Sequence, residues 1–346
     1  MNKKIITAAV ASALAVPAAV SAQETTVTTY GRINNAIQYD KAEGSENSWG
    51  LRNVVSRLGF KAKSDLGNGL SAIGRYEFFT FTNREGNFDS VGGKGRGGIN
   101  DTRLGYVGLS GAWGAVTIGN QWSAFYDTLG THFSQSYSVG YFLYSSVMGG
   151  PFRTSNTIKY ANSFGPAYIE LDVRMSNNVP PTNADEEVLG RDSGDNAAID
   201  GVGLGGSFNI GESFTLAAAY DVDKKDLAAD DNTRYGLAGK FNAGNWWLTL
   251  GYYALDDGSK DDMWHIQGGT SFGKTNLLLA YSQASVGADA GGRTGGDPTQ
   301  WLLNINHNMG GGFRVYYEGV LYDDDNSGSR SDIDVHLFGM RYDFST

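Results

Sequence analysis

Charged side chains at alternate positions of otherwise apolar segments are the residues in this chain that could do chemistry. If these segments are β-strands, every second side chain points to the same face, and the polar face carries eleven cations against five carboxylates. On a wall that lines a water-filled passage, charges within about 8 Å of a passing ion control its passage. The cations are Arg32, Arg57, Lys61, Arg75, Arg103, Lys159, Arg174, Arg234, Lys240, Arg314 and Arg341, and the carboxylates are Glu77, Glu170, Asp172, Glu318 and Asp343.

The whole chain has the opposite charge balance, with 27 Lys and Arg against 37 Asp and Glu. We expect the surplus acids to lie in three polar loops, so that an acidic entrance leads to a more basic wall. These acids are Asp185, Glu186, Glu187, Asp192, Asp195, Asp200, Asp221, Asp223, Asp226, Asp230, Asp231, Asp256, Asp257, Asp261 and Asp262.

Short glycine-rich turns and long polar excursions divide the chain. The short turns lie at 65–69, 110–114, 162–166, 209–213, 242–245, 273–276 and 308–312, each between two alternating segments, and they predict hairpins. The excursions lie at about 40–53, 83–101, 121–156, 176–200, 221–233, 255–262, 284–299 and 323–332. Together these connections predict sixteen antiparallel strands. An even strand number, with short turns on one side and long loops on the other, is typical of an all-β transmembrane barrel.

The alternation within single segments agrees with a barrel wall. In 167–174 the odd positions are Ala, Ile, Leu and Val, whereas the even positions are Tyr, Glu, Asp and Arg. The same pattern returns in 234–241, 300–306 and 313–321. A soluble β-sandwich would also alternate, so this pattern alone leaves a secreted sandwich as the alternative.

The start of the chain predicts export. Lys3 and Lys4 precede an apolar, alanine-rich stretch that ends in the small residues of 20–22, which is the pattern of a signal peptide cut after Ala22. The mature domain would then be 23–346. Cysteine is absent, whereas 49 glycines and recurrent aromatics near segment ends fit a barrel with interfacial aromatic girdles.

Several segments resemble the Gram-negative general porins, which are trimeric outer-membrane proteins. The segment 55–61, followed by 65–70, resembles the family's second hairpin, and 102–109 with 114–121 resembles its fourth and fifth strands. The entry of the third loop is similar at 125–130, and 339–344 resembles the closing strand. Each motif is short, but together they follow the family's order through the mature chain.

This resemblance implies a homotrimer of sixteen-stranded barrels in the outer membrane, in contact with lipid and lipopolysaccharide. Each barrel would hold a water-filled pore for ions and small hydrophilic solutes, narrowed by an inward-folded third loop. The implied pore constriction is formed by Arg32, Arg57, Arg75, Glu77, Arg103, Asp127 and Arg153. No enzymatic activity, cofactor or nucleic-acid partner is expected.

The third loop departs from the family's pattern, because Asp127 is its only acid between residues 123 and 155. We therefore expect weaker cation preference than the net charge of −10 suggests, extending to anion preference. Structural salt bridges to Glu77 are the alternative role for the arginines. The loop's aromatics also leave open a sugar-selective channel in which the rings would stack on oligosaccharides. These aromatics are Phe125, Tyr126, Phe133, Tyr137, Tyr141, Phe142 and Tyr144.

Three weaker patterns complete the sequence. Asp323, Asp325 and Asp334 fall at positions 1, 3 and 12 of a calcium-loop pattern that lacks its final Glu, so a solvated loop and a calcium ion bridging lipopolysaccharide are alternatives. His265, near Asp261 and Asp262, is the residue around which a barrel enzyme would be built. Residues 201–206 fit G-x-G-x-x-G, but no helix follows, which favours glycines on the lipid face or at a barrel corner.

Overall fold

The computed structural model describes residues 24–42, 46–82, 98–133, 143–144, 148–176, 198–224, 231–288, 295–323 and 332–346. The predicted signal peptide, residues 1–22, lies outside these ranges. Within them, strands dominate, and no helix is long and apolar enough to cross a membrane. The third loop contributes the helix α2 (Ala124–Thr128) and the 3-10 turn η1 (Gly130–His132).

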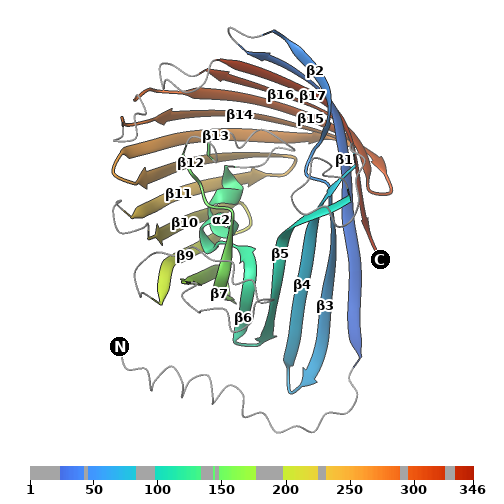
Figure 1. The fold of residues 1–346 in the computed structure, drawn as a ribbon, viewed down its shortest axis with the longest axis vertical. Coiled ribbons are helices and arrows are strands. Elements are labelled where there is room, and N and C mark those ends of the chain that lie inside the picture. The colour runs from blue at the N-terminus through green and yellow to red at the C-terminus, as the bar shows by residue number, and fades with distance from the viewer. Residues whose placement is uncertain are drawn as a thin grey trace, which may run out of the picture.

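The strands follow one another in a single antiparallel sheet (Figure 1). They are β1 (Thr25–Ala42), β2 (Ser48–Asn53), β3 (Arg57–Gly67), β4 (Leu70–Phe81), β5 (Gly98–Gly111), β6 (Gly114–Trp122), β7 (Arg153–Phe164), β8 (Ala167–Met175), β9 (Ile199–Ile210), β10 (Phe214–Asp223), β11 (Asn232–Ala243), β12 (Trp246–Asp256), β13 (Lys260–Phe272), β14 (Thr275–Ser285), β15 (Thr299–Gly310), β16 (Phe313–Asp323) and β17 (Ile333–Ser345).

The sheet closes on itself because β1 pairs with β17 along thirteen residue pairs. β2 and β3 both pair with β1, so they are two halves of one barrel strand. The barrel therefore has sixteen strands, which confirms the prediction. Closure leaves no open sheet edge, as a structure surrounded by lipid requires.

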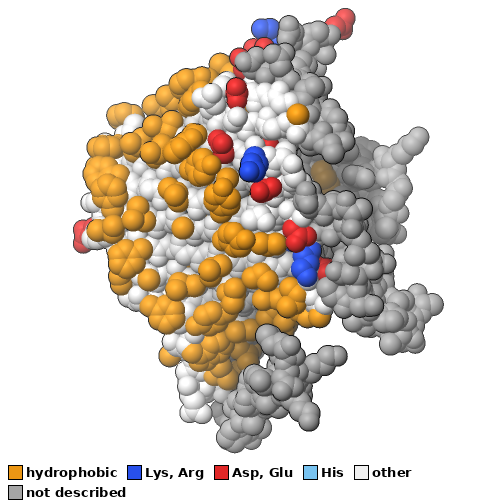
Figure 2. Space-filling model, turned by 90° about the vertical axis from the view of Figure 1, so that its left-hand side faces the viewer, with side chains coloured by type: hydrophobic (Ala, Val, Ile, Leu, Met, Phe, Trp, Pro, Cys, Tyr) orange, Lys and Arg blue, Asp and Glu red, His pale blue; other side chains and the backbone are white. Residues whose placement is uncertain are grey.

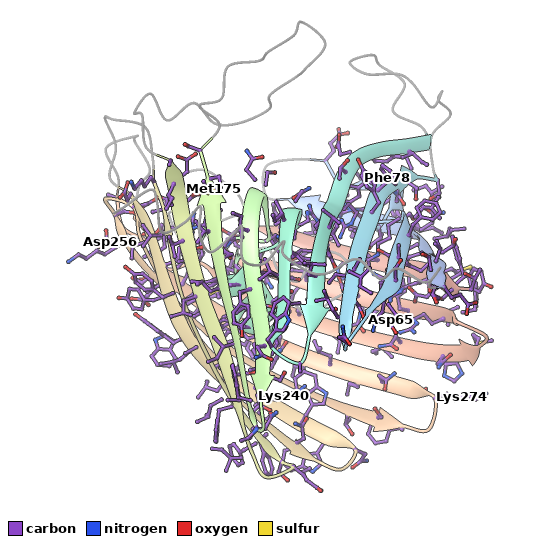
Figure 3. The ribbon with its side chains drawn as sticks, turned by 90° about the horizontal axis from the view of Figure 1, so that it is seen from below. Asp65, Phe78, Met175, Lys240, Asp256 and Lys274 are labelled. Atoms are coloured by element: carbon purple, nitrogen blue, oxygen red, sulfur yellow. The ribbon has the colours of Figure 1, made fainter. Side chains whose placement is uncertain are left out.

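All seven predicted short turns join consecutive strands. Figure 3 shows Lys274 in one of them, at the opposite end of the strands from Met175 and Asp256. The prediction of a long loop at 255–262 is wrong, because β12 ends at Asp256 and β13 begins at Lys260. Gly258 adopts a φ of 96°, which suits glycine and permits a tight connection. The run of acids had suggested a loop, but alternation continues through it and buries the side chain of Asp261 inside the barrel.

The two faces of the wall differ as predicted. On β8, Ile169 and Leu171 are 41% and 40% exposed on the outside, whereas Glu170 and Asp172 are 2% and 0% exposed on the inside. Figure 2 shows the outer side, where hydrophobic side chains form a broad band with few charges. An apolar outer band of this kind faces the hydrocarbon of a membrane.

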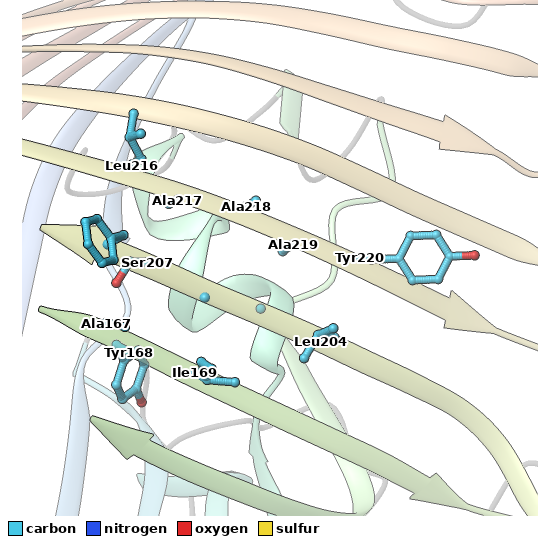
Figure 4. A pocket seen from close by; sticks show the side chains of 13 residues that line it. Ala167, Tyr168, Ile169, Leu204, Ser207, Leu216, Ala217, Ala218, Ala219 and Tyr220 are labelled. Atoms are coloured by element: carbon cyan, nitrogen blue, oxygen red, sulfur yellow. The ribbon is translucent and has the colours of Figure 1, made fainter. Parts of the chain in front are cut away.

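A shallow apolar hollow of about 540 Å³ lies on the outer face of β8, β9 and β10 (Figure 4). Small residues form its floor, since Gly206 and Ala218 lie between the larger Ile169, Leu204 and Leu216. The hollow therefore belongs to the apolar outer surface and takes no part in the lumen.

Candidate functional site in the barrel lumen

The third loop lies inside the barrel, and α2 is its best-defined element (Figure 1). The Ser123 side chain caps the helix by accepting a hydrogen bond from the Tyr126 N–H at 3.0 Å. The Asp172 carboxylate on β8 accepts a second one, from the Ala124 N–H at 2.6 Å. Because helix N-termini attract negative charge, Asp172 both satisfies and orients this end of the helix. The predicted inward fold of the loop is confirmed.

Glycines on β9 provide the space in which α2 docks. A Cβ atom on Gly205 would lie 2.0 Å from Thr128 Oγ1 and 2.7 Å from the Ala124 carbonyl oxygen. A Cβ atom on Gly203 would lie 2.7 Å from Asp172 Oδ2, and one on Gly201 would lie 2.3 Å from Arg174 Nε. The lipid-face or barrel-corner interpretation of 201–206 was therefore wrong for these three glycines. Their spacing of two residues places all of them on the inner face, where a side chain would collide with what packs there.

Apolar side chains hold the rest of the loop to the wall. Phe125, Leu129, Phe133, Tyr144 and Met148 are each at most 2% exposed and pack in one cluster against residues of β10–β14 and β16. Hydrogen bonds complete the contact: Tyr253 Oη donates to the Met148 carbonyl at 2.9 Å, and Gln300 Oε1 accepts from the Leu143 N–H at 3.2 Å. The described parts of the loop thus contact the inner wall as far as β16.

This packing bears on the sugar-selective alternative. Phe125, Phe133 and Tyr144 lie behind the loop, where no solute can stack on them. Tyr126 and Phe152 are only partly buried, with ring centroids 4.9 Å apart. Tyr137, Tyr141 and Phe142 lie outside the described residues. Among the described third-loop residues, most aromatics therefore serve docking.

The surroundings of His132 predict that docking of the loop depends on pH. Burial, reinforced by the nearby Lys240, lowers the pKa of His132 to about 4. Its backbone carbonyl accepts a hydrogen bond from Gln267 at 2.6 Å, and this bond survives a change of side chain. Since an ordinary histidine titrates near 6.5, a displaced loop takes up a proton more readily than the docked loop below that pH.

We predict that docking weakens as the pH falls from about 6.5 toward 4, so that single-channel current fluctuates increasingly over this interval. His132→Gln should remove this component, because glutamine carries no charge at either pH. Fluctuations that are identical in wild type and His132→Gln across the interval would exclude His132 as their origin.

The opposite side of the lumen carries six arginines and two carboxylates, which we call the arginine cluster. Glu77 Oε1 lies 2.7 Å from Arg103 Nε and 3.7 Å from Arg57 Nη1, while Glu77 Oε2 lies 2.9 Å from Arg75 Nη2. Around Asp343, Arg32, Arg341 and Arg314 lie at 2.8, 2.7 and 3.8 Å. Each carboxylate is thus contacted by three arginines, and the cluster keeps a net charge of +4.

Aromatic rings support the cluster. Tyr30 Oη donates to Glu77 Oε2 at 2.8 Å and accepts from Arg75 Nε at 2.7 Å. The Arg103 guanidinium lies 4.3 Å from the centroid of Phe79. Arg153 lies over the same ring at 5.5 Å and over Trp122 at 5.1 Å. Such stacking holds guanidinium groups in fixed orientations.

The predicted constriction residues fall into three groups. Arg57, Arg75 and Arg103 contact Glu77. Arg32 contacts Asp343, and Arg153 stacks beside Arg103. Asp127 lies apart from the cluster, with its Oδ2 atom 2.7 Å from Lys159 Nζ. Asp343, Arg314 and Arg341 form the second part of the arginine cluster. The sequence placed them on the lumen face but not among the constriction residues. Barrel closure could have indicated this contact, because β17 pairs with β1 and places Asp343 opposite Arg32.

Carboxylates gather beneath the third loop. Lys159 joins Asp127 to Glu170, and Arg174 contacts Asp172 at 3.3 Å and Asp221 at 2.6 Å. Arg234 contacts Asp221 at 2.8 Å, and Asp223 lies 3.8 Å from Arg174. The loop placement of Asp221 and Asp223 was wrong, since both lie on β10. Glu170, Asp172 and Asp221 are at most 2% exposed, so these acids anchor the loop rather than face a solute.

The described residues add no support for the calcium-loop pattern or for an enzyme site at His265. Asp325 lies outside the described residues. Asp334 forms an ion pair with Lys41, with 3.5 Å between Oδ2 and Nζ. No group of three or more histidines and acids within the described ranges could hold a metal ion. His265 is buried on β13, where Nδ1 lies 2.7 Å from Ser282 Oγ and the ring makes a T-shaped contact with Phe133.

A closed barrel with an apolar outer wall, a charged inner wall and an inward-folded loop defines a transmembrane channel. A family model described as Gram-negative porin matches residues 7–328, and the chain therefore belongs to the Gram-negative porin family. It is a general, non-enzymatic outer-membrane porin for passive diffusion.

Individual relatives agree. Outer membrane porin F of Escherichia coli O6:K15:H31 is 28% identical over 73% of this chain and 70% of its own length. Outer membrane protein U of Vibrio parahaemolyticus is 23% identical over 99% of this chain and 100% of its own. Among solved structures, the anion-selective porin from Comamonas acidovorans has a TM-score of 0.69 at 18% identity, covering 93% of this chain and all of its own. Salmonella typhi OmpF in complex with daunomycin has a TM-score of 0.70 at 17% identity, with coverage of 93% and 98%.

Proposed function

We propose that the arginine cluster forms the selective part of this porin and makes the channel prefer anions. The observation that carries this proposal is the ratio of six arginines to two carboxylates. In a narrow aqueous passage, an ion responds to uncompensated charge within about a Debye length, ~8 Å at physiological salt. Glu170, Asp172 and Asp221 under the third loop are buried and paired with cations, so we expect them to offset the cluster weakly.

The experiment is a reversal-potential measurement on single channels in a potassium chloride gradient. Potassium and chloride have similar mobilities, so the sign of the potential reports the charge preference of the pore. The proposal requires the sign of an anion-preferring channel. High salt should reduce the preference, because screening shortens the reach of the arginines.

We further propose that the mature chain starts at Gln23 and assembles as a homotrimer whose outer walls meet lipid and lipopolysaccharide. Membership of the porin family supports the trimer, as does the OmpT structure of Vibrio cholerae described as a trimer form, which has a TM-score of 0.66 at 17% identity. Native mass spectrometry tests both points. The expected result is a complex of three chains that each begin at Gln23, and a monomer or a retained leader would contradict it.

A further inference from the structure

The barrel strand made of β2 and β3 contains one extra residue next to Arg57. Asn53 pairs with Asn35 at the end of β2, and Arg57 pairs with Arg32 at the start of β3. Between these pairs β1 has two residues, whereas the facing strand has three, Val54 to Ser56. This arrangement is a β-bulge, which shifts the register by one and bends the strand.

The bulge decides which way Arg57 points. On β1 the side chains of Ile33 and Ile37 are about half exposed on the outer face, so Arg32 and Ala36 face inward. Arg52 pairs with Ala36 and Arg57 with Arg32, so both arginines face the lumen although they are five residues apart. In an uninterrupted strand an odd spacing places side chains on opposite faces. Without the extra residue, either Arg57 or Arg52 would point into lipid.

A second bulge serves Arg103. Glu77 pairs with Leu104, but the next residue, Phe78, pairs with Thr102, so Arg103 is the extra residue of β5. Arg103 and Leu104 are consecutive, yet both are buried, at 3% and 0% exposure. An unbroken strand could not bury two neighbouring side chains on one face. The bulge thus adds a guanidinium beside Glu77 without removing another inward residue.

Ser56 holds the first bulge in place. Its hydroxyl accepts a hydrogen bond from the Asn34 N–H at 2.9 Å and donates to the Asn34 carbonyl at 3.3 Å. The Val54 N–H donates to the same carbonyl at 2.7 Å, and the Ser56 carbonyl accepts from the Thr80 N–H at 3.0 Å. Ser56 is fully buried. These bonds maintain Val55 at a φ of 56°, a left-handed conformation that is strained for a β-branched residue.

We propose that Val55 and Ser56 are positioning residues for selectivity: the bulge they form turns Arg57 into the lumen, as the bulge at Arg103 does for its own side chain. The inference rests on the proposed function only for its effect on selectivity. The orientation of residue 57 can be tested independently of ion preference.

The first test uses single cysteines, since the chain contains no native cysteine. Arg52→Cys, Arg57→Cys, Leu51→Cys and Leu58→Cys are each labelled with a charged, water-soluble thiol reagent in the intact channel. With the bulge present, positions 52 and 57 should react and positions 51 and 58 should not. Deletion of Val55 should reverse the reactivity of one neighbouring pair: either position 51 reacts instead of 52, or position 58 reacts instead of 57. If positions 52 and 57 both stay reactive in the assembled deletion variant, the inference is wrong.

The second test applies if the Val55 deletion variant does not assemble. Ser56→Ala removes the hydroxyl but leaves the chain length unchanged. Ser56→Ala should shift the reversal potential toward cations, by less than Arg57→Ser does. In channels that already carry Arg57→Ser, it should cause no further shift of the reversal potential. Val55→Gly should keep wild-type selectivity, because glycine adopts the left-handed conformation without strain.

The outcomes separate the two proposals. Provided that Arg57→Ser itself shifts the reversal potential, an equal shift by Ser56→Ala with and without Arg57, or no shift in either background, would overturn the positioning role. Inverted labelling together with an Arg57→Ser channel of unchanged reversal potential would support the bulge's role in orientation and refute the selectivity proposal.

Discussion

Replacing Arg57 and Arg103 together with serine should move the reversal potential strongly toward cations. The double substitution lowers the net charge of the arginine cluster from +4 to +2 and leaves Glu77 with Arg75 as its remaining arginine. In the proposed constriction, this change would act within about a Debye length of a permeating ion. Single substitutions should each give a smaller shift in the same direction.

The matched control removes two cations far from the cluster. Lys224 follows the end of β10 and Lys260 begins β13; both are exposed, and neither strand carries any of the six arginines. Lys224→Ser with Lys260→Ser changes the net charge equally but should leave the reversal potential almost unchanged. Equal shifts in the two double variants would mean that total charge, not the cluster, governs permeation.

The second large effect is expected from Gly205→Leu, which should displace α2 from the wall. A leucine side chain cannot coexist with Thr128 and the Ala124 carbonyl in their observed places. Overpacking of this kind costs about 1–3 kcal/mol, which lowers the ratio of docked to displaced loop by about 5- to 150-fold. A displaced loop remains tied to β6 and β7 inside the barrel, so it enters the water-filled passage.

We therefore expect Gly205→Leu channels to show a lower mean conductance and frequent transitions between current levels in planar bilayers. Gly239→Leu is the control, because a Cβ at Gly239 meets only Leu216, at 3.7 Å, on the outer face. Gly205→Ala should give a milder form of the same behaviour. Steady wild-type conductance in assembled Gly205→Leu channels would show that α2 does not depend on this space.

Much of the fold could be predicted from local patterns. Turn residues and the alternation of apolar and polar side chains act over a few residues, so they gave the sixteen strands and the inward face of β8 correctly. The loop at 255–262 was misjudged because a short polar turn and a long polar loop have the same composition. Asp221 was misplaced for the same reason.

The site was harder to predict because it depends on register. Arg52 and Arg57 carry a readable signal, since two lumen charges at an odd spacing imply an inserted residue between them. Gly201, Gly203 and Gly205 carry another, since glycine at every second position leaves one face of a strand free for close packing. The meeting of Asp343 with Arg32 had no local signal, because barrel closure joins residues that are far apart in the sequence.

The reversal potential of the wild-type channel in a potassium chloride gradient tests the central claim most directly. The six arginines around Glu77 and Asp343 predict the sign of an anion-preferring pore, with a preference that weakens as salt rises. A reversal potential with the sign of a cation-preferring pore would contradict the claim that the arginine cluster controls permeation.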